Sequence, residues 1–162
     1  MAPDDLEAIV ADPSHDHKLE LRLWLRLLAC ANIISADIRR NLRKSFDVTL
    51  PQFDLLAQLQ REPDGLRLGD LSRRLMVSNG NVTGLVDKLA AEGFVVREAL
   101  PGDRRVQVVR MTKAGAALFS VMAEAHEGWL ARLMGDMPRD TMENLLSELK
   151  QLKASVRGNE AS

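Results

Sequence analysis

The sequence has little from which a disulfide-bonded, metal-binding or membrane-spanning protein could be built. It contains one cysteine, no tyrosine and three histidines in 162 residues. A single cysteine, Cys30, excludes an internal disulfide framework and any zinc site with several thiolate ligands, as expected in a reducing compartment. Apolar runs are short as well, since Arg22 and Arg26 interrupt the richest one. The N-terminus is acidic where a signal peptide would be basic, so we expect a cytoplasmic protein with no membrane partner.

Arrangements typical of enzymes are also missing. His15 and His17 lie in the acidic N-terminal segment and His126 in a late helical segment, so no catalytic triad or metal-ligand spacing is formed. The side chains of Asp12, His15, Asp16 and His17 could bind a metal ion opportunistically, but a solvated leader is the stronger interpretation. We therefore expect no enzymatic activity, no cofactor and no dedicated metal site.

The net charge of −1 conceals an uneven distribution of charged residues. Residues 1–20 hold one lysine against six acidic residues, whereas residues 21–60 hold six basic against three acidic, and residues 61–112 nine against seven. An acidic leader thus masks a basic middle, where a polyanionic partner would bind. With 46% hydrophobic residues, the chain can form one domain with a core and hardly two.

Residues 19–46 are expected to form one long helix. Apolar residues recur at every fourth position, with arginines between them. A second stripe through Leu21, Trp24 (or Leu25) and Leu28 makes the first half of this helix apolar nearly all round. Because a lone surface helix would not tolerate this, the pattern indicates a subunit interface.

Shorter elements follow this helix. Helical periodicity and capping signals predict helices that begin at Thr49, Leu68, Ser78, Thr112 and Pro138. Two segments rich in β-branched residues, 94–100 and 106–111, flank Pro101-Gly102-Asp103 and predict a hairpin with an exposed turn. The expected class is mainly α with a small β-hairpin (α+β).

Two short helices joined by a tight turn, followed at once by a hairpin with a basic tip, predict a winged helix-turn-helix. Ser78 to Thr83 would open its second helix, where short amide and hydroxyl groups reach base edges. Asn79 and Asn81 can offer a paired donor and acceptor to adenine, and Thr83 can touch a thymine methyl. The alternative is that these residues only cap and solvate a helix start.

The turn of the hairpin carries Asp103-Arg104-Arg105. An acidic residue two positions before an arginine can orient its guanidinium, and an extended Arg105 suits a narrow minor groove, where negative potential is concentrated. The alternative is a solvated turn with a weak surface ion pair.

Several sequence blocks in this region resemble the multiple-antibiotic-resistance regulator (MarR) family. They are Thr-x-x-Gln-Phe, Leu-x-x-Leu before Val-Ser, Val-Thr-x-Leu-Val-Asp-Lys-Leu, Gly-Phe-Val-x-Arg, Asp-Arg-Arg and Met-Thr-x-x-Gly. With the flanking helices the resemblance covers residues 18–155, and the combination is much more specific than any single block.

The resemblance implies a transcriptional repressor that binds a pseudo-palindrome in double-stranded DNA as a homodimer. It places the base-reading positions on Ser78, Asn79, Asn81 and Thr83, and the wing arginine on Arg105 with Asp103 as its orienting partner. Further candidates for DNA contact are Arg73, Arg74, Lys88 and Arg104, with solvated helix faces as the alternative for the first three. Gly80 and Gly84 depart from the commoner family pattern, and each costs up to about 1 kcal/mol relative to Ala.

The resemblance also divides the chain into parts. They are a flexible acidic leader (1–17), a dimerisation helix (18–46), the winged helix-turn-helix (47–111), dimerisation helices (112–157) and a frayed tail (158–162).

Two other roles are alternatives to a ligand-responsive DNA-binding regulator: a redox sensor and a protein-binding winged helix. Family members that sense peroxide use a cysteine in the first helix, with tyrosines that stabilise the thiolate. Because this chain lacks tyrosine and Cys30 lies among Leu27, Leu28, Ala31 and Ile33, we predict a buried core cysteine, with a redox-sensing regulator through Cys30 as the alternative. A winged helix that binds only a partner protein would not need the polar start at Ser78 or the Arg105 wing.

A small-molecule effector is the last expectation, because family members commonly release DNA when an aromatic or acidic ligand enters a crevice beside the dimer helices. The candidate cationic residues are Arg22, Arg26, Arg39, Arg40 and Arg43, and the candidate apolar residues are Trp24, Ile33, Phe46, Phe53, Leu56, Phe119 and Trp129. The SNGNVTGLVDKL block and the arginine-rich first helix look similar to repressors of hydroxycinnamate catabolism. An aromatic acid or its coenzyme A thioester is therefore expected, with a solvated helix face over an ordinary core as the alternative.

Overall fold

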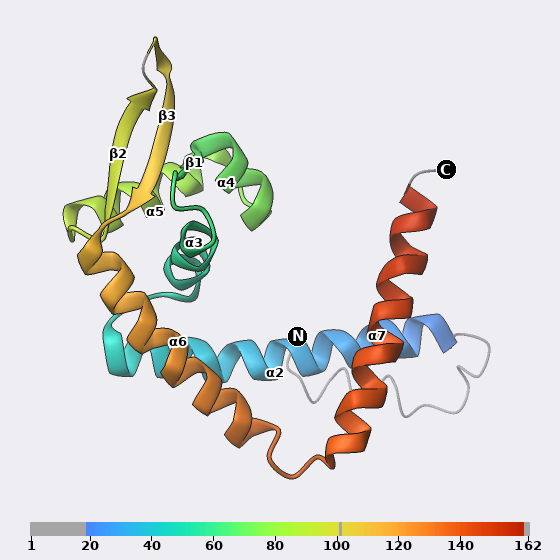
Figure 1. Cartoon of the computed structure of the whole chain (residues 1–162). Coiled ribbons are helices and arrows are strands. Elements are labelled where there is room, and N and C mark those ends of the chain that lie inside the picture. The colour runs from blue at the N-terminus through green and yellow to red at the C-terminus, as the bar shows by residue number, and fades with distance from the viewer. Residues whose placement is uncertain (1–18, 101, 161–162) are drawn as a thin grey trace. The chain divides into compact units, whose positions relative to one another are not determined.

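The computed structural model describes residues 19–100 and 102–160 (Figure 1). Its elements are α2 (Leu19–Phe46), α3 (Leu50–Gln60), β1 (Leu66–Arg67), α4 (Leu68–Leu75), α5 (Asn79–Ala91), β2 (Val95–Leu100), β3 (Asp103–Met111), α6 (Lys113–Leu133) and α7 (Arg139–Glu160). They form two units, one ending at Glu127 and the other beginning at Gly128, so α6 runs from the first into the second. The predicted fold class is confirmed: the chain is mainly helical with a small antiparallel sheet.

Three details differ from the prediction. The sheet has a third strand, β1, which is two residues long and too short to give a sequence pattern. Strand β3 begins at Asp103 instead of residue 106. Helix α7 continues to Glu160, which lies within the segment 158–162 that was predicted as a frayed tail. No proline interrupts this segment, and each added residue gains a helical hydrogen bond. The predicted leader, 1–17, lies outside the described residues.

The sheet has the strand order β1-β3-β2, and both pairings are antiparallel. Leu66 pairs with Val109, and Val95 pairs with Met111. Gly65 precedes β1 with a φ of 85°, and a Cβ at this position would lie 2.5 Å from the carbonyl oxygen of Val109. Glycine is therefore required where the α3–β1 connection crosses β3.

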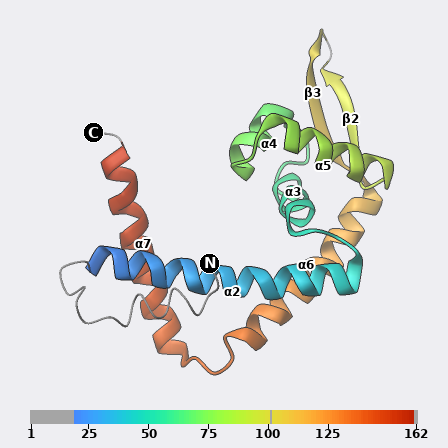
Figure 2. The same cartoon turned by 180° about the vertical axis from the view of Figure 1, so that it is seen from behind.

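The core of the first unit lies between α3, α4, α5 and the base of the sheet. Its fully buried apolar residues include Leu55, Leu56, Leu59, Leu71, Val82, Val86, Leu89, Val95 and Val109. Figure 2 shows β2 and β3 rising beside α5, so the hairpin projects from a packed base. Helix α5 and the wing are therefore held by one continuous core.

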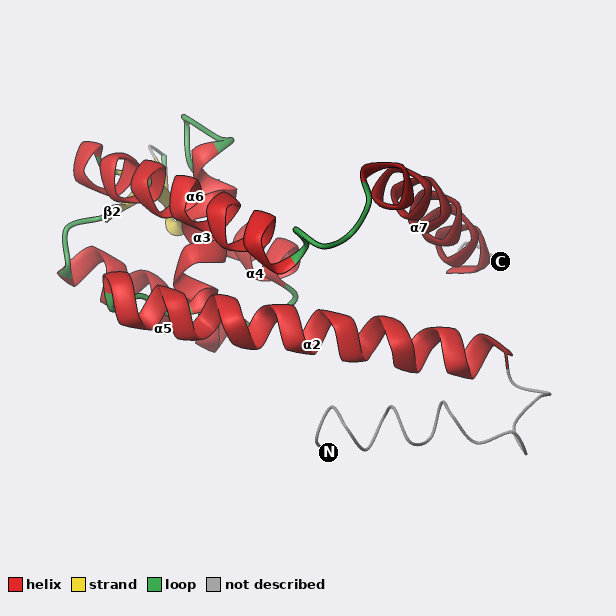
Figure 3. Cartoon of the chain, turned by 90° about the horizontal axis from the view of Figure 1, so that it is seen from below, coloured by secondary structure: helices red, strands yellow, loops and turns green. Residues whose placement is uncertain are grey.

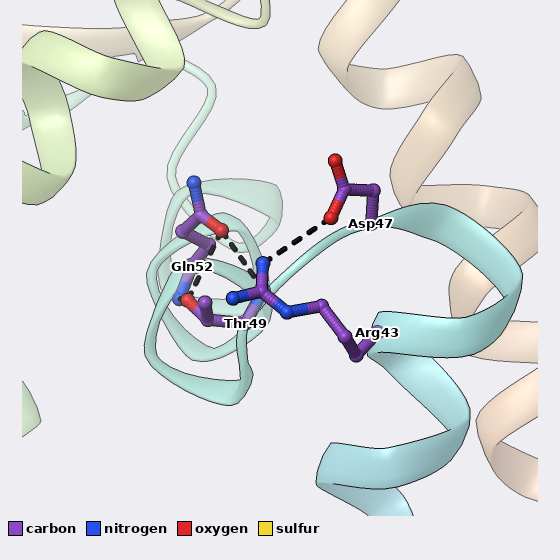
Figure 4. Close-up of polar contacts among 4 residues, drawn as sticks. All are labelled: Arg43, Asp47, Thr49 and Gln52. Atoms are coloured by element: carbon purple, nitrogen blue, oxygen red, sulfur yellow. Dashed lines mark hydrogen bonds and ion pairs between the residues drawn. The ribbon is translucent and has the colours of Figure 1, made fainter.

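The connection from α2 to α3 is fixed by a capping box (Figure 4). The backbone N–H of Thr49 donates to Gln52 Oε1 at 2.8 Å, and the N–H of Gln52 donates to Thr49 Oγ1 at 3.4 Å. Asp47 has a φ of 52° and pairs with Arg43 at 3.2 Å. Because these contacts satisfy helix-end groups, α3 begins at Leu50, as the capping signal at Thr49 predicts.

Most of the long helix α2 is not covered by the described chain. Ala29, Ile38 and Leu42 are buried, whereas Leu19 is 70%, Trp24 57% and Ile33 52% exposed. Figures 1 and 3 show its N-terminal half extending away from the winged part. None of the described helices combines the length and apolar character that a membrane crossing requires.

Cys30 is exposed on this helix, so the predicted buried cysteine is wrong. Ala31 and Ile33 beside it are exposed as well. Apolar neighbours in the sequence predict that this face of the helix is buried. Among the described residues, however, none covers it.

Candidate nucleic-acid interface

Helix α5 presents two side-chain amides to solvent at its first turn. Ser78 is the N-cap, and its side-chain oxygen accepts a hydrogen bond from the N–H of Asn81 at 3.3 Å. The hydroxyl of Thr83 donates to the carbonyl oxygen of Asn79 at 2.9 Å. The hydroxyls of Ser78 and Thr83 therefore stabilise the helix start, while the exposed amides of Asn79 and Asn81 have no hydrogen-bond partner among the described residues.

The same helix carries Gly80 and Gly84 on one exposed face, four residues apart. A Cβ at either position would meet nothing within 4 Å. Packing within the chain thus gives no reason for glycine, although glycine destabilises a helix interior. Because this face has no side chains at Gly80 and Gly84, another molecule has room to approach the backbone of α5.

The turn between α4 and α5 is held from inside. Ser72 is 9% exposed, and its hydroxyl donates to the carbonyl oxygen of Val77 at 2.6 Å. This bond fixes the path from the C-terminus of α4 to the N-cap Ser78. The two helices are therefore set at a defined geometry before any ligand is bound.

The wing differs in one respect from the sequence prediction. Asp103 accepts a hydrogen bond from the backbone N–H of Arg105 at 3.0 Å, so the carboxylate shapes the turn backbone, whereas the prediction had it orient the guanidinium. Arg105 itself is exposed in β3. Arg104 also lies in β3.

One ion pair and one hydrogen bond connect the wing to the rest of the first unit. Arg97 on β2 pairs with Asp87 on α5 at 3.1 Å, which ties the wing to the predicted recognition helix. Arg110 on β3 donates through Nε to the carbonyl oxygen of Asp64 at 2.9 Å and pairs with Glu98 at 3.3 Å. These contacts limit how far the wing can move relative to α5.

A cleft of 410 Å³ lies between the start of α4 and the wing. It is lined by Arg67, Leu68, Gly69, Asp70, Arg73, Arg97, Arg105, Val106 and Gln107. The structure thus brings the predicted residues Arg73 and Arg105 to one basic surface. Of its four arginines, Arg67 and Arg97 were missed, because their separation in sequence hides their proximity. The signals available were an arginine directly before the start of α4 and one on β2, two residues after the buried Val95 and so on the same face of the strand.

The predicted phosphate contacts Arg73, Arg74 and Lys88 are exposed. Arg73 pairs with Asp70, and Arg74 pairs with Glu62 at 2.8 Å. Lys88 is exposed on α5. The two ion pairs lie at the surface, where such pairs contribute little stability, so the arginines can exchange these partners for phosphate groups.

The predicted effector residues come from α2, α3 and α6. Arg22, Trp24 and Ile33 are exposed on α2, and Arg26 lies on the same half of that helix. Arg39, Arg40 and Arg43 are exposed further along α2, and Arg40 pairs with Asp37. Trp129 belongs to the second unit.

The predicted aromatic lining is in part ordinary core. Phe53 and Leu56 are 7% and 0% exposed, and Phe46 is half-buried. Phe53 stacks on Phe119 with a ring-centroid distance of 5.5 Å. A ligand at this position would have to displace core contacts.

A residue that was not predicted joins this aromatic cluster. The ring of His126 lies 5.0 Å from that of Phe53. Desolvation raises the pKa of Asp54, and the electrostatic interaction with His126 opposes that rise. Within the described residues no group of three or more His, Cys, Asp or Glu side chains is arranged to hold a metal ion. The opportunistic metal ligands Asp12, His15, Asp16 and His17 lie outside the described residues.

Comparison with known proteins gives a consistent result. The sequence profile of the MarR family matches residues 46–106. The transcriptional activatory protein BadR of Rhodopseudomonas palustris is 30% identical over 154 residues, which cover 92% of this chain and 87% of BadR. The crystal structure of a MarR family transcriptional regulator from Silicibacter pomeroyi superposes with a TM-score of 0.75 and 34% identity, covering 86% of this chain and 96% of that one.

A more distant structure has a ligand. CouR from Rhodococcus jostii RHA1, bound to p-coumaroyl-CoA, superposes with a TM-score of 0.68 and 18% identity, covering 80% of this chain and 90% of CouR. At this identity the likeness concerns the fold.

Proposed function

The chain belongs to the MarR family of DNA-binding transcriptional regulators, and on this premise we propose that two copies bind one pseudo-palindromic operator and are released by a small aromatic acid or its coenzyme A thioester. The observation that carries the proposal is the pairing of exposed amides on the first turn of α5 with an arginine-lined surface at the wing. The amides suit base edges in a major groove, and the arginines suit phosphates and a narrow minor groove.

Each half-site is proposed to receive one α5. Asn79 and Asn81 reach base edges, while Gly80 and Gly84 allow the helix backbone to approach the groove closely. Arg105 extends from the wing into the adjacent minor groove. Arg73, Arg74 and Lys88 contact phosphates and set the register, without reading the sequence.

A homodimer is supported by the uncovered apolar faces of the long helices. Besides those of α2, the exposed large apolar residues include Val121 on α6 and Leu145, Leu146, Leu149 and Val156 on α7. Helix α7 contains no buried residue in the chain as described. Because a helix with an apolar face needs a partner to be stable, a second copy of α2, α6 and α7 is the proposed cover.

The proposed effector follows from residues on α2 and α6. Exposed Arg39, Arg40 and Arg43 offer cationic groups for carboxylate or phosphate, and the half-buried ring of Phe119, which stacks on Phe53, offers an aromatic contact. The named relatives are transcriptional regulators, and BadR is named as an activatory protein. We propose repression here, because release of a dimer from an operator that overlaps a promoter frees the promoter.

The test combines binding and release. The full chain is titrated onto the DNA segment upstream of its own gene at fixed salt, and the complex is then titrated with p-coumarate and p-coumaroyl-CoA while heat and DNA binding are measured. Binding followed by release with either compound is expected. No binding to any upstream segment would contradict the DNA-binding assignment, whereas binding without heat or release would contradict the effector assignment alone.

A further inference from the structure

Met76 combines two unfavourable features in the turn between α4 and α5. It is the C-cap of α4 and has φ 54° and ψ 39°, a left-handed backbone conformation that residues other than glycine rarely adopt. Its side chain is 92% exposed, the highest value among the large exposed apolar residues of the described chain. Glycine would relieve the strain, and a polar residue would relieve the exposure.

Nothing in the described chain uses this side chain. The turn is already fixed by the bond from the Ser72 hydroxyl to the Val77 carbonyl oxygen, and the backbone N–H of Met76 donates to the carbonyl oxygen of Arg73 at 3.3 Å. These contacts involve the backbone of residues 76 and 77 and would be kept by glycine. The methionine side chain therefore contributes neither packing nor hydrogen bonds to the fold.

The position of Met76 indicates where its side chain is used. It precedes the N-cap Ser78 by two residues, and Ser78, Asn79, Gly80 and Asn81 are all exposed. A long, unbranched thioether at this place can reach the same groove as the first turn of α5. Apolar side chains recognise the 5-methyl group of thymine in the major groove, the one apolar group that distinguishes bases there.

We propose that Met76 is a specificity-determining residue that contacts a thymine methyl at the edge of each half-site. The inference rests on the proposed function, in which α5 enters the major groove. It adds an apolar readout to the amide readout of Asn79 and Asn81.

The experiment uses the duplex that the wild-type full chain selects from a pool of random duplexes. Affinity for this duplex is measured at one salt concentration for wild type, Met76→Gly and the control Met76→Leu, and the measurement is repeated on duplexes in which single thymines are replaced by deoxyuridine. Thermal midpoints are recorded for the three proteins.

Met76→Gly is expected to raise the thermal midpoint and to bind the selected duplex roughly three- to ten-fold more weakly, the range expected for one to two lost methyl-sized contacts. Met76→Leu keeps wild-type affinity within about two-fold, since it retains the apolar volume. One deoxyuridine substitution weakens wild type by the same factor and leaves Met76→Gly unchanged, because both changes remove one contact.

Three results would overturn the inference. If Met76→Gly binds the selected duplex as tightly as wild type, the Met76 side chain does not touch DNA. If the thermal midpoint of Met76→Gly is lower than that of wild type, the side chain stabilises the fold. If Met76→Gly binds more weakly but no deoxyuridine substitution weakens binding by wild type, the Met76 side chain contacts deoxyribose and not a base. Failure of wild type to select any duplex would instead refute the proposed DNA binding, and the inference with it.

Discussion

The winged part and the long helices of this chain differ in how much of their apolar surface they cover. Leu55, Leu71, Val86 and Val109 in the winged part are 0% exposed, whereas Trp24 on α2 is 57% and Leu146 on α7 is 68% exposed. The winged part therefore has a complete core of its own. The long helices leave apolar surface uncovered within the described chain, and the proposed division, with DNA reading in the first region and assembly in the second, rests on this contrast.

The largest expected effect is a loss of stability in the winged part, which has its own core. A Cβ at Gly115 would lie 2.0 Å from the carbonyl oxygen of Phe94, at the place where α6 packs against the base of the hairpin. Gly115→Ala is expected to lower the free energy of unfolding by about 3 kcal/mol or more, since backbone must move. Urea titration measures it.

Gly128→Ala is the matched control in the same helix, because a Cβ there would meet nothing within 4 Å. It is expected to stabilise by up to about 1 kcal/mol. Equal effects of the two substitutions would contradict the close approach at Gly115.

The next effect separates DNA reading from assembly. Arg105→Ala is expected to weaken binding to the selected duplex by roughly 1 to 3 kcal/mol, and Asn81→Ala to change sequence preference as well as affinity. Arg139→Ala on α7 removes an equal charge outside the winged part, where Arg139 pairs with Glu143. Fluorescence anisotropy at matched salt gives the three affinities. An unchanged affinity for Arg105→Ala would show that the wing assignment is wrong.

A smaller effect sharpens the comparison within α5. Gly84→Ala is expected to stabilise the chain by about 0.5 to 1 kcal/mol, because alanine is the better helix former. The added methyl on the exposed face is expected to weaken DNA binding by at least about three-fold, through steric conflict in the groove. Gly158→Ala in α7, where a Cβ also meets nothing within 4 Å, stabilises without this loss. Tighter DNA binding by Gly84→Ala would contradict close approach of the α5 backbone.

The smallest effect concerns the boundary of the winged part. Desolvation raises the pKa of Asp54, so the folded chain binds this proton more tightly than the unfolded chain. The ionised carboxylate is therefore unfavourable above the folded pKa, and the penalty disappears as the pH falls to the usual value of 3.8.

Asp54→Asn is expected to raise the thermal midpoint at pH 7 by less than about 3 °C, since the side chain is partly solvated. The gain is expected to vanish near pH 4. A variant that is less stable than wild type at pH 7 would show that the pairing of Asp54 with His126 outweighs desolvation.

Local signals in the sequence account for much of the fold. Thr49, Ser78 and Thr112 cap helices where they were expected to, and the β-branched runs form β2 and β3. Strand β1 could not be predicted, because two residues have no periodicity and Leu66 pairs only through tertiary contact with Val109.

The candidate interface was accessible to sequence analysis only in part. The polar start of α5 is a local feature, whereas the cleft depends on Arg67 and Arg97 meeting across the fold. The spacing in the sequence could link Asp103 to Arg105. Whether the Asp103 carboxylate accepts a hydrogen bond from the backbone N–H or from the guanidinium of Arg105 depends on the conformation of the turn. The exposure of Cys30 could not be predicted from its apolar neighbours, because Ala31 and Ile33 beside it are exposed on α2 as well.

The most direct test of the contrast between the two regions is sedimentation equilibrium at micromolar concentration, with and without the selected duplex. Wild type and Ser147→Glu, a control on the exposed surface of α7, are expected to form dimers and to place two chains on each duplex. Leu146→Glu is expected to raise the dimer dissociation constant by about 100-fold, or roughly 3 kcal/mol, and to weaken DNA binding while the winged part stays folded. A wild-type chain that sediments as a stable monomer, or one chain per duplex, would contradict the assignment of the long helices to assembly.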